Sequence, residues 1–184
     1  EAPILRTSIG SHSAPIRAID VDSGGRYAVT AAEDKTAGVW DLKSGKLLKV
    51  LRPPMGPGND GKLYAAAITP DGAMVAVGGW SADNDVYLFD RASGALRHRI
   101  TGLPDVVTQL VFSPDGKTLA IGLWGVNGVR LFGSDSAWHS SRETGSDNHY
   151  EGAVSGAKFS GDGARLALAS TDGLIRVYKV AQHS

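Results

Sequence analysis

The chain has 184 residues, with 24 glycines, 8 prolines and no cysteine, and its 19 basic and 19 acidic side chains give a formal net charge of zero. This composition is typical of a globular domain and excludes a disulfide-stapled fold and a thiolate metal site. Zero net charge removes the bulk attraction to nucleic acid, so no nucleic-acid partner is expected. No apolar run approaches the ~20 residues that span a bilayer, so no membrane insertion is expected.

The chain begins Glu1-Ala2-Pro3, without a methionine or a targeting segment. This beginning and the lack of cysteine fit export after signal cleavage, although cytosolic proteins without cysteine are common. The compartment stays unknown, and a periplasmic or other extracytoplasmic location is only slightly favoured. The first predicted strand, residues 4–10, matches residues 96–102 and is interpreted as an outer strand without a sheet of its own.

Four segments with one shared pattern follow along the chain. They are residues 21–29, 68–76, 112–120 and 159–167, and each places a glycine between two apolar runs. These glycines, Gly25, Gly72, Gly116 and Gly163, are separated by 47, 44 and 47 residues. Proline presets the first dihedral of a turn and glycine accepts a positive φ, so each segment predicts a tight turn between two strands. The chain is therefore a fourfold repeat.

Each repeat unit reads as four short strands, because its apolar residues alternate or run in bursts of four to six without a helical period. Such a unit cannot bury both faces of its sheet alone and must stack on copies of itself. Small residues, Ala18, Ala65 and Gly156, stand on the first strand of three units, with Gln109 in the remaining one. Small side chains suit strands crowded around an axis. We therefore predict an all-β propeller of four-stranded antiparallel blades, with a β-sandwich as the alternative.

In the first unit Gly10 precedes His12 near the start, and Trp40-Asp41 ends the third strand. With these residues the unit resembles a blade of the WD-repeat β-propellers. In that family a histidine, a serine or threonine, an aspartate and the tryptophan form a hydrogen-bonded relay across the blade. The resemblance implies this structural relay for His12, Thr30, Asp34 and Trp40. Histidine, aspartate and threonine also make up nucleophile triads, but the repeat accounts for all three without catalysis.

The other units keep the strands and lose this relay. The Trp-Asp pair becomes Phe89-Asp90, Phe132-Gly133 and Tyr178-Lys179. We therefore expect apolar packing alone to hold these blades. In the fourth unit Asp172 keeps the turn aspartate, but His149 lies one residue from the histidine position, which leaves a partial relay there in doubt.

The strand tally predicts a single propeller segment over residues 1–184. Its parts are a loose outer strand at 1–10, blades at 11–52, 53–102 and 103–146, and a fourth blade at 147–184 that lacks its outer strand. Resemblance to the family implies closure by an N-terminal outer strand and about seven blades. Three arrangements follow: a piece of a longer propeller, a homodimer joined at open blade edges into an eight-bladed ring, and a strained four-bladed monomer.

Candidate partner-binding residues recur eight positions after each turn glycine. They are Glu33, Trp80, Trp124 and Thr171. Tryptophan is enriched at binding hot spots, whereas the alternative is that both indoles pack against the neighbouring blade. Residues 134–150 are interpreted as a ragged outer strand and a solvated turn. Their alternative role, a recognition loop, makes Tyr150 a further candidate.

We expect a non-catalytic scaffold for protein or peptide partners. The strands of a propeller build the ring, so function lies in its loops. No enzyme, cofactor or metal is expected: Asp83, Asn84 and Asp85 lack the rest of a calcium loop. A propeller hydrolase needs inward-facing carboxylates on several inner strands, and only Asp20 comes close. The resemblance also implies an alternative, a regulatory portion of a larger bacterial effector such as a caspase-like peptidase.

Overall fold

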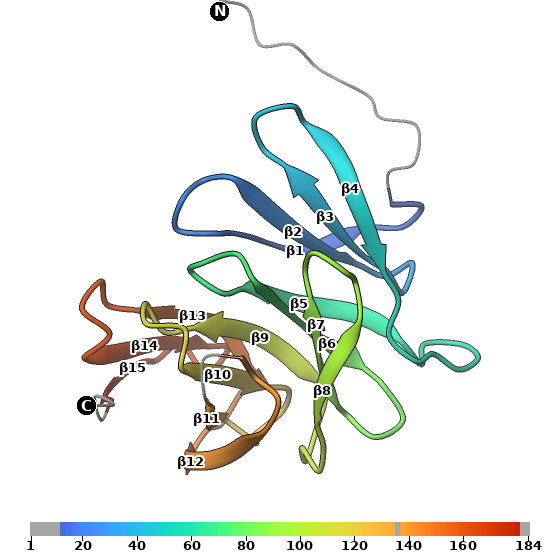
Figure 1. Cartoon of the computed structure of the whole chain (residues 1–184). Helices are drawn as coiled ribbons and strands as arrows, with labels where there is room; N and C mark the ends of the chain where they lie inside the picture. Colours follow the sequence, from blue (N-terminus) through green and yellow to red (C-terminus); the bar gives the residue numbers. More distant parts are fainter. Residues whose placement is uncertain (1–11, 135–136, 181–184) are drawn as a thin grey trace, which may run out of the picture.

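A computed structural model describes residues 12–134 and 137–180 of the chain, and the outer strand predicted at residues 4–10 lies outside them. The described residues form four antiparallel sheets whose strands follow the order of the sequence (Figure 1). The first sheet contains β1 (Ile16–Val21), β2 (Tyr27–Ala32), β3 (Ala37–Asp41) and β4 (Lys46–Leu51), and the second contains β5 (Lys62–Ile68), β6 (Met74–Trp80), β7 (Val86–Asp90) and β8 (Leu96–Ile100). The third contains β9 (Val107–Phe112), β10 (Thr118–Leu123), β11 (Val129–Ser134) and β12 (Ser141–Asp147), and the fourth contains β13 (Val154–Phe159), β14 (Arg165–Ser170) and β15 (Ile175–Lys179).

The four sheets are arranged radially. The first strand of each sheet is its inner strand: β1 packs beside β5, β5 beside β9, and β9 beside β13. These four strands line one cavity of about 310 Å³, and the remaining strands fan outward from them (Figure 1). The prediction of an all-β propeller is confirmed. The sandwich alternative is wrong, because the sheets share a row of inner strands and do not form two facing layers.

The turn between the first two strands of each sheet has the predicted geometry. Gly25, Gly72, Gly116 and Gly163 have φ values of 61°, 73°, 72° and 71°, which favour glycine over any other residue. In the second sheet the Thr69 hydroxyl donates to Asp71 at 2.6 Å, and the third and fourth sheets repeat this contact from a serine. The aspartate thus closes the turn and sets the register of both strands.

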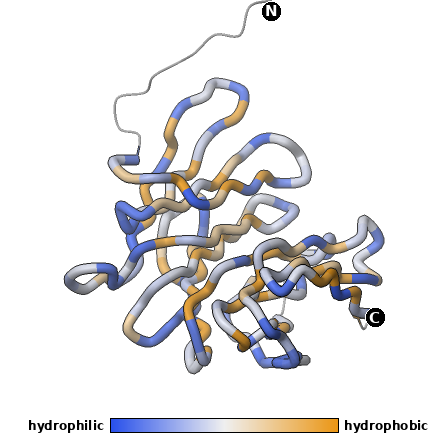
Figure 2. The backbone as a smooth tube through the Cα atoms, turned by 180° about the vertical axis from the view of Figure 1, so that it is seen from behind, coloured by the Kyte–Doolittle hydropathy of each residue, from blue (hydrophilic) through white to orange (hydrophobic). Residues whose placement is uncertain are grey.

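Apolar side chains of neighbouring sheets pack against one another in three clusters. Figure 2 shows where hydrophobic residues, in orange, lie along the backbone. Close approach requires a small residue on the second strand. A Cβ on Gly78 would lie 2.9 Å from Cγ1 of Val107, and one on Gly122 would lie 2.6 Å from Cγ1 of Val154. The valines belong to the inner strand of the next sheet in each case. These two glycines therefore allow the radial packing.

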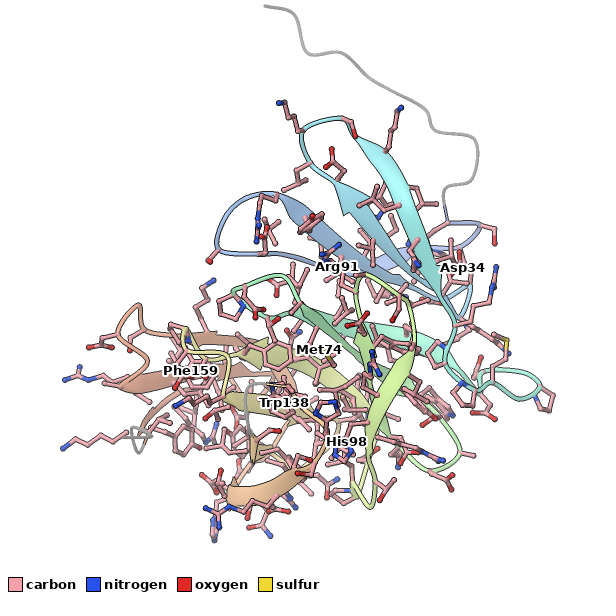
Figure 3. All side chains as sticks on the ribbon, viewed as in Figure 1. Asp34, Met74, Arg91, His98, Trp138 and Phe159 are labelled. Carbon is pink, nitrogen blue, oxygen red and sulfur yellow. The ribbon has the colours of Figure 1, made fainter. Side chains whose placement is uncertain are left out.

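The segment after β11 contributes to the core of the fold. Strand β12 pairs with β11, so this part of residues 134–150 is an outer strand. Trp138, which Figure 3 labels, is fully buried. Its ring centroid lies 5.3 Å from that of Phe112 in an edge-on arrangement. Its Nε1–H donates to the Gly116 carbonyl at 2.8 Å. Trp138 therefore anchors the outer strand to the turn before β10.

Candidate interaction surface

Four side chains of the first sheet form a continuous chain of hydrogen bonds. The Trp40 Nε1–H donates to Thr30 Oγ1 at 2.8 Å, and Thr30 Oγ1 lies 2.8 Å from His12 Nε2. On the other side of the ring, His12 Nδ1 lies 3.0 Å from Asp34 Oδ2. All partners are satisfied when Nδ1 carries the proton and the Thr30 hydroxyl donates to Nε2. The structure thus brings together the four residues named from the family resemblance.

Asp34, which Figure 3 labels, also holds the backbone around it. The amides of Ser13 and Thr36 donate to its carboxylate at 2.8 and 3.0 Å, and the Thr36 hydroxyl donates at 2.7 Å. Burial acts to raise the pKa of Asp34, but the hydrogen bonds from Thr36, Ser13 and His12 together outweigh it and hold the pKa below its usual value. This carboxylate therefore ties the β2–β3 turn to the segment before β1.

The second sheet also contains a carboxylate with a basic partner, but this partner is an arginine of the outer strand and not a histidine. Arg99 on β8 pairs with the buried Asp85 and lies 2.9 Å from Asp83, and its guanidinium lies 5.6 Å from the centre of the Tyr87 ring. Burial raises the pKa of Asp85, against the lowering effect of Arg99. The expectation that apolar packing alone holds this blade is wrong, because a cation of the outer strand reaches the buried carboxylate after β6.

The fourth sheet also contains a polar network. Arg176 on β15 lies 2.8 Å from Asp172 and 4.1 Å from the centre of the Tyr150 ring. The Tyr178 hydroxyl donates to Asp147 at 2.6 Å and lies 3.0 Å from the Tyr150 hydroxyl. Arg176 holds the pKa of Asp172 well below its usual range. Apolar packing alone is wrong for this blade too.

The structure places two residues of the fourth unit that the sequence singled out, His149 and Tyr150. The side chain of His149 is 93% exposed and pairs with Asp147, so it takes no part in a relay with Asp172. Tyr150 is 4% exposed and packs between the third and fourth sheets. The candidate role of Tyr150 in partner binding is corrected on this ground, because its ring is covered by Arg176 and the neighbouring sheet.

Each inner strand contains one β-bulge at the same position. Pairing with the second strand skips the bulged residue in every sheet, and these residues are Arg17, Tyr64, Thr108 and Ser155. A bulge breaks the regular alternation of a strand and re-aims one side chain. All four bulged residues line a single groove of about 480 Å³ at the ends of the inner strands.

Trp80 and Trp124 line the same groove from the second and third sheets, and Thr171 lines it from the fourth. We call it the tryptophan groove and define it by these two tryptophans and the four bulged residues. Trp80 is 47% exposed and Trp124 is 59% exposed. Packing against a neighbouring blade, the alternative role, therefore leaves about half of each indole uncovered.

Glu33 stands beside the tryptophan groove and not in its lining. Its carboxylate pairs with Arg17, and Lys62 Nζ lies 3.0 Å from its Oε2. Lys62 and, next, Arg17 hold the pKa of Glu33 below its usual value. Two cations therefore share one carboxylate, and this corner of the groove carries a net positive charge.

Sequence reasoning missed the bulged residues as members of the site. Arg17 and Tyr64 each stand immediately before a small residue of the inner strand, Ala18 and Ala65 respectively. The recurring position before that small residue is the signal that could have identified them. A bulge itself leaves no separate mark in the residue pattern.

The described residues contain no group of three or more histidine and acidic side chains placed to hold a metal ion. The Asp83–Asp85 segment is occupied by the Arg99 guanidinium. Asp20 accepts a hydrogen bond from the Ile68 amide at 2.9 Å and so joins β1 to β5. Across residues 12–134 and 137–180, no helix has the length and apolar character needed to cross a bilayer.

Comparison with known proteins gives consistent matches. The family model described as "WD domain, G-beta repeat" matches residues 4–41, 45–90 and 143–179. The chain is 29% identical over 177 residues to Pre-mRNA-processing factor 19 homolog 2 of Arabidopsis thaliana, covering 95% of this chain and 30% of that protein. It is 26% identical over 169 residues to the small ribosomal subunit protein RACK1y of Oryza sativa subsp. japonica, covering 83% of this chain and 44% of that protein.

A solved structure shows the same fold. A chain of the "Crystal Structure of Mitotic Checkpoint Complex" matches with a TM-score of 0.78 at 20% identity, covering 94% of this chain and 51% of that chain. This chain thus spans about half of that structure and less than half of the two relatives named above. These matches give no support to the alternative of a bacterial peptidase effector.

The family model does not match residues 91–142, which contain β8 and most of the third sheet. The third sheet nevertheless has the same four strands and the same bulge as its neighbours. The model matches well over half of the chain, and the fold agrees with it. The chain therefore belongs to the WD-repeat family.

Proposed function

We propose that the chain is a non-catalytic scaffold that binds protein or peptide partners at the tryptophan groove. The observation that carries this proposal is the pair of half-exposed indoles, Trp80 and Trp124, on one concave surface. Tryptophan dominates hot spots because it buries a large area and keeps one hydrogen-bond donor. One relative is named a small ribosomal subunit protein, a component of a larger assembly, which supports a role in protein contacts.

Capture of peptides from a display library tests this function. A random dodecapeptide phage library should be enriched on the immobilised chain, and replacing both Trp80 and Trp124 by alanine should reduce that enrichment at least tenfold. The matched control is Leu48→Ala, which removes a 47% exposed apolar side chain from the outer strand β4. Enrichment that survives loss of both tryptophans, in a folded variant, contradicts the groove as the partner site.

We also infer self-association, from two sheet faces that have no partner sheet within the described chain. Ile19 and Val21 of the first sheet are 69% and 43% exposed. Their equivalents in the second sheet, Ala66 and Ile68, are buried against the first sheet. On the fourth sheet Ile175 and Val177 are 76% and 62% exposed, whereas their first-sheet equivalents Ala37 and Val39 are fully buried.

These two faces repeat the two surfaces that already pack against each other between the first and second sheets. The fourth sheet of one copy can therefore pack on the first sheet of a second copy, which completes the eight-bladed ring. Uncovered apolar faces of this kind favour association.

Sedimentation velocity should give a species of twice the 19.2 kDa chain mass, and Ile175→Lys should shift it to the single-chain mass. Leu42→Lys, at a 44% exposed position outside both faces, is the control and should leave the species unchanged. A wild-type chain that stays at 19.2 kDa at all concentrations rejects the second copy as the occupant.

A further inference from the structure

We propose that the tryptophan groove takes a peptide segment in which a bulky apolar side chain stands next to an aspartate or glutamate. This inference rests on the proposed function, because it assumes that the groove is the partner site. It adds the chemical class of the partner, argued from the contacts of the groove itself.

The apolar part of the segment follows from the walls of the groove. Trp80 and Tyr64 come from the second sheet and Trp124 from the third. The remaining apolar lining consists of Val106, Ala153 and Val154. A cavity of about 480 Å³ accommodates one large side chain with its neighbouring backbone. Aromatic walls on two sides favour a flat or branched apolar side chain, since it buries area against both rings.

The neutral polar side chains of the groove are largely engaged within the protein. The Thr108 hydroxyl donates to the Val154 carbonyl at 2.7 Å, and Gln109 Nε2 donates to the Ser155 carbonyl at 3.2 Å. Both contacts join the third sheet to the fourth, so using these groups for a partner would break the packing of the two sheets. The recognition of a charged group on the partner therefore falls to Arg17.

Arg17 is the one charged residue among the described residues that line the groove. Its side chain is 53% exposed, whereas the side chain of Glu33 is 15% exposed. Lys62 competes with Arg17 for that carboxylate, so one positive charge stays uncompensated at this corner. A carboxylate of the partner, close to its apolar side chain, completes the charge balance and is the group that guanidinium binds well.

Two other partners fit these contacts less well. Single-stranded nucleic acid stacks on exposed aromatic rings, but it also needs a cationic track for its phosphates, and this chain has zero net charge and one excess cation here. A cationic side chain suits an aromatic box, but here Arg17 would repel it.

The test uses the indole Nε1–H signals of the four tryptophans in nuclear magnetic resonance spectra. The probes are three capped dodecapeptides with a glycine–serine frame and a central phenylalanine, which differ only in the residue beside it: aspartate, asparagine or lysine. Capping removes the terminal carboxylate, so the acidic side chain is the one source of negative charge. We expect the signals of Trp80 and Trp124 to shift, and those of Trp40 and Trp138, whose indoles donate inside the protein, to stay in place.

The expected order of affinity is aspartate, then asparagine, then lysine, with roughly a two- to fivefold gain for aspartate over asparagine, as for a partly exposed ion pair. Arg17→Gln should abolish this preference, so that the aspartate and asparagine peptides bind this variant equally well. Arg165→Gln is the control, because Arg165 is an exposed arginine at the other end of β14, and it should keep the preference.

The possible failures are distinct. Equal binding of the three peptides at Trp80 and Trp124 overturns this inference and leaves the proposed function standing. A preference for the lysine peptide, or tighter binding of a dodecathymidine oligonucleotide than of the aspartate peptide, overturns it in favour of a cationic or a nucleic-acid partner. No shift of Trp80 or Trp124 with any peptide, together with failed enrichment in the display experiment, rejects the groove altogether.

Discussion

Replacing Trp138 by alanine is expected to lower the free energy of unfolding by about 3–5 kcal/mol, the usual cost of removing a buried aromatic side chain. Trp138 is fully buried, packs edge-on against Phe112, and donates to the Gly116 carbonyl. The truncation thus leaves a cavity beside β9 and an unpaired carbonyl at the turn before β10. Urea unfolding followed by far-ultraviolet circular dichroism measures the change.

Trp124→Ala provides a control of the same residue type. Trp124 is 59% exposed in the tryptophan groove, so its loss should change the free energy of unfolding by less than about 1 kcal/mol. Trp138→Phe keeps a ring and removes the Nε1–H donor. Its loss of unfolding free energy should lie between those of Trp138→Ala and Trp124→Ala. Equal effects of the alanine variants at positions 138 and 124 would show that Trp138 does not anchor the outer strand.

Replacing Asp34 by alanine is expected to cost about 2–4 kcal/mol, because several donors lose one shared acceptor. These donors are the amides of Ser13 and Thr36, the Thr36 hydroxyl and the His12 ring. Trp40→Phe removes a single hydrogen bond, to Thr30, and should cost about 1 kcal/mol. Both residues belong to one chain of hydrogen bonds. The double variant should therefore lose less free energy of unfolding than the two single variants lose together.

The difference in the free energy of unfolding between wild type and Asp34→Ala should also depend on pH. The pKa of Asp34 is lowered in the folded chain, so its carboxylate contributes fully above the unfolded pKa of ~3.9, and the contribution disappears as pH falls through the lower folded pKa. The stabilities of wild type and variant should therefore differ most near neutral pH and converge as the pH falls below this unfolded value. Glu143→Ala, which removes a surface carboxylate 3.8 Å from Arg130, should have little effect at either pH. A difference that grows with acidity contradicts the assignment.

Much of the fold follows from local patterns. The glycines at the four turns have the positive φ that a glycine between two apolar runs predicts, and the spacing of these turns implies the repeat. The relay residues of the first sheet were accessible too, because His12, Asp34 and Trp40 stand at positions that the WD-repeat pattern names. Turn chemistry and repetition are properties of neighbouring residues, so one sequence suffices to identify them.

The arginine networks of the second and fourth sheets could not be predicted in this way. Arg99 reaches Asp85 from β8, the outer strand of the same sheet, and Arg176 reaches both Asp172 and Tyr150. A basic residue on a strand normally indicates a solvated face, and nothing in its local pattern distinguishes one that turns inward. The pairing depends on the register between strands, which a charge pattern does not specify.

Three tryptophans show the same difference between what a local pattern predicts and what the tertiary structure decides. Trp138 lies in a segment rich in serine and glycine and is fully buried, whereas Trp80 and Trp124 end or follow apolar strands and are half exposed. The amino-acid sequence alone determined the strands, their turns and the need of each thin sheet for neighbours, because these depend on local dihedral preference and on how little a single sheet can bury. Only the tertiary structure decided which side chains meet at the tryptophan groove, because four bulges, each set by pairing between strands, turn Arg17, Tyr64, Thr108 and Ser155 toward one place.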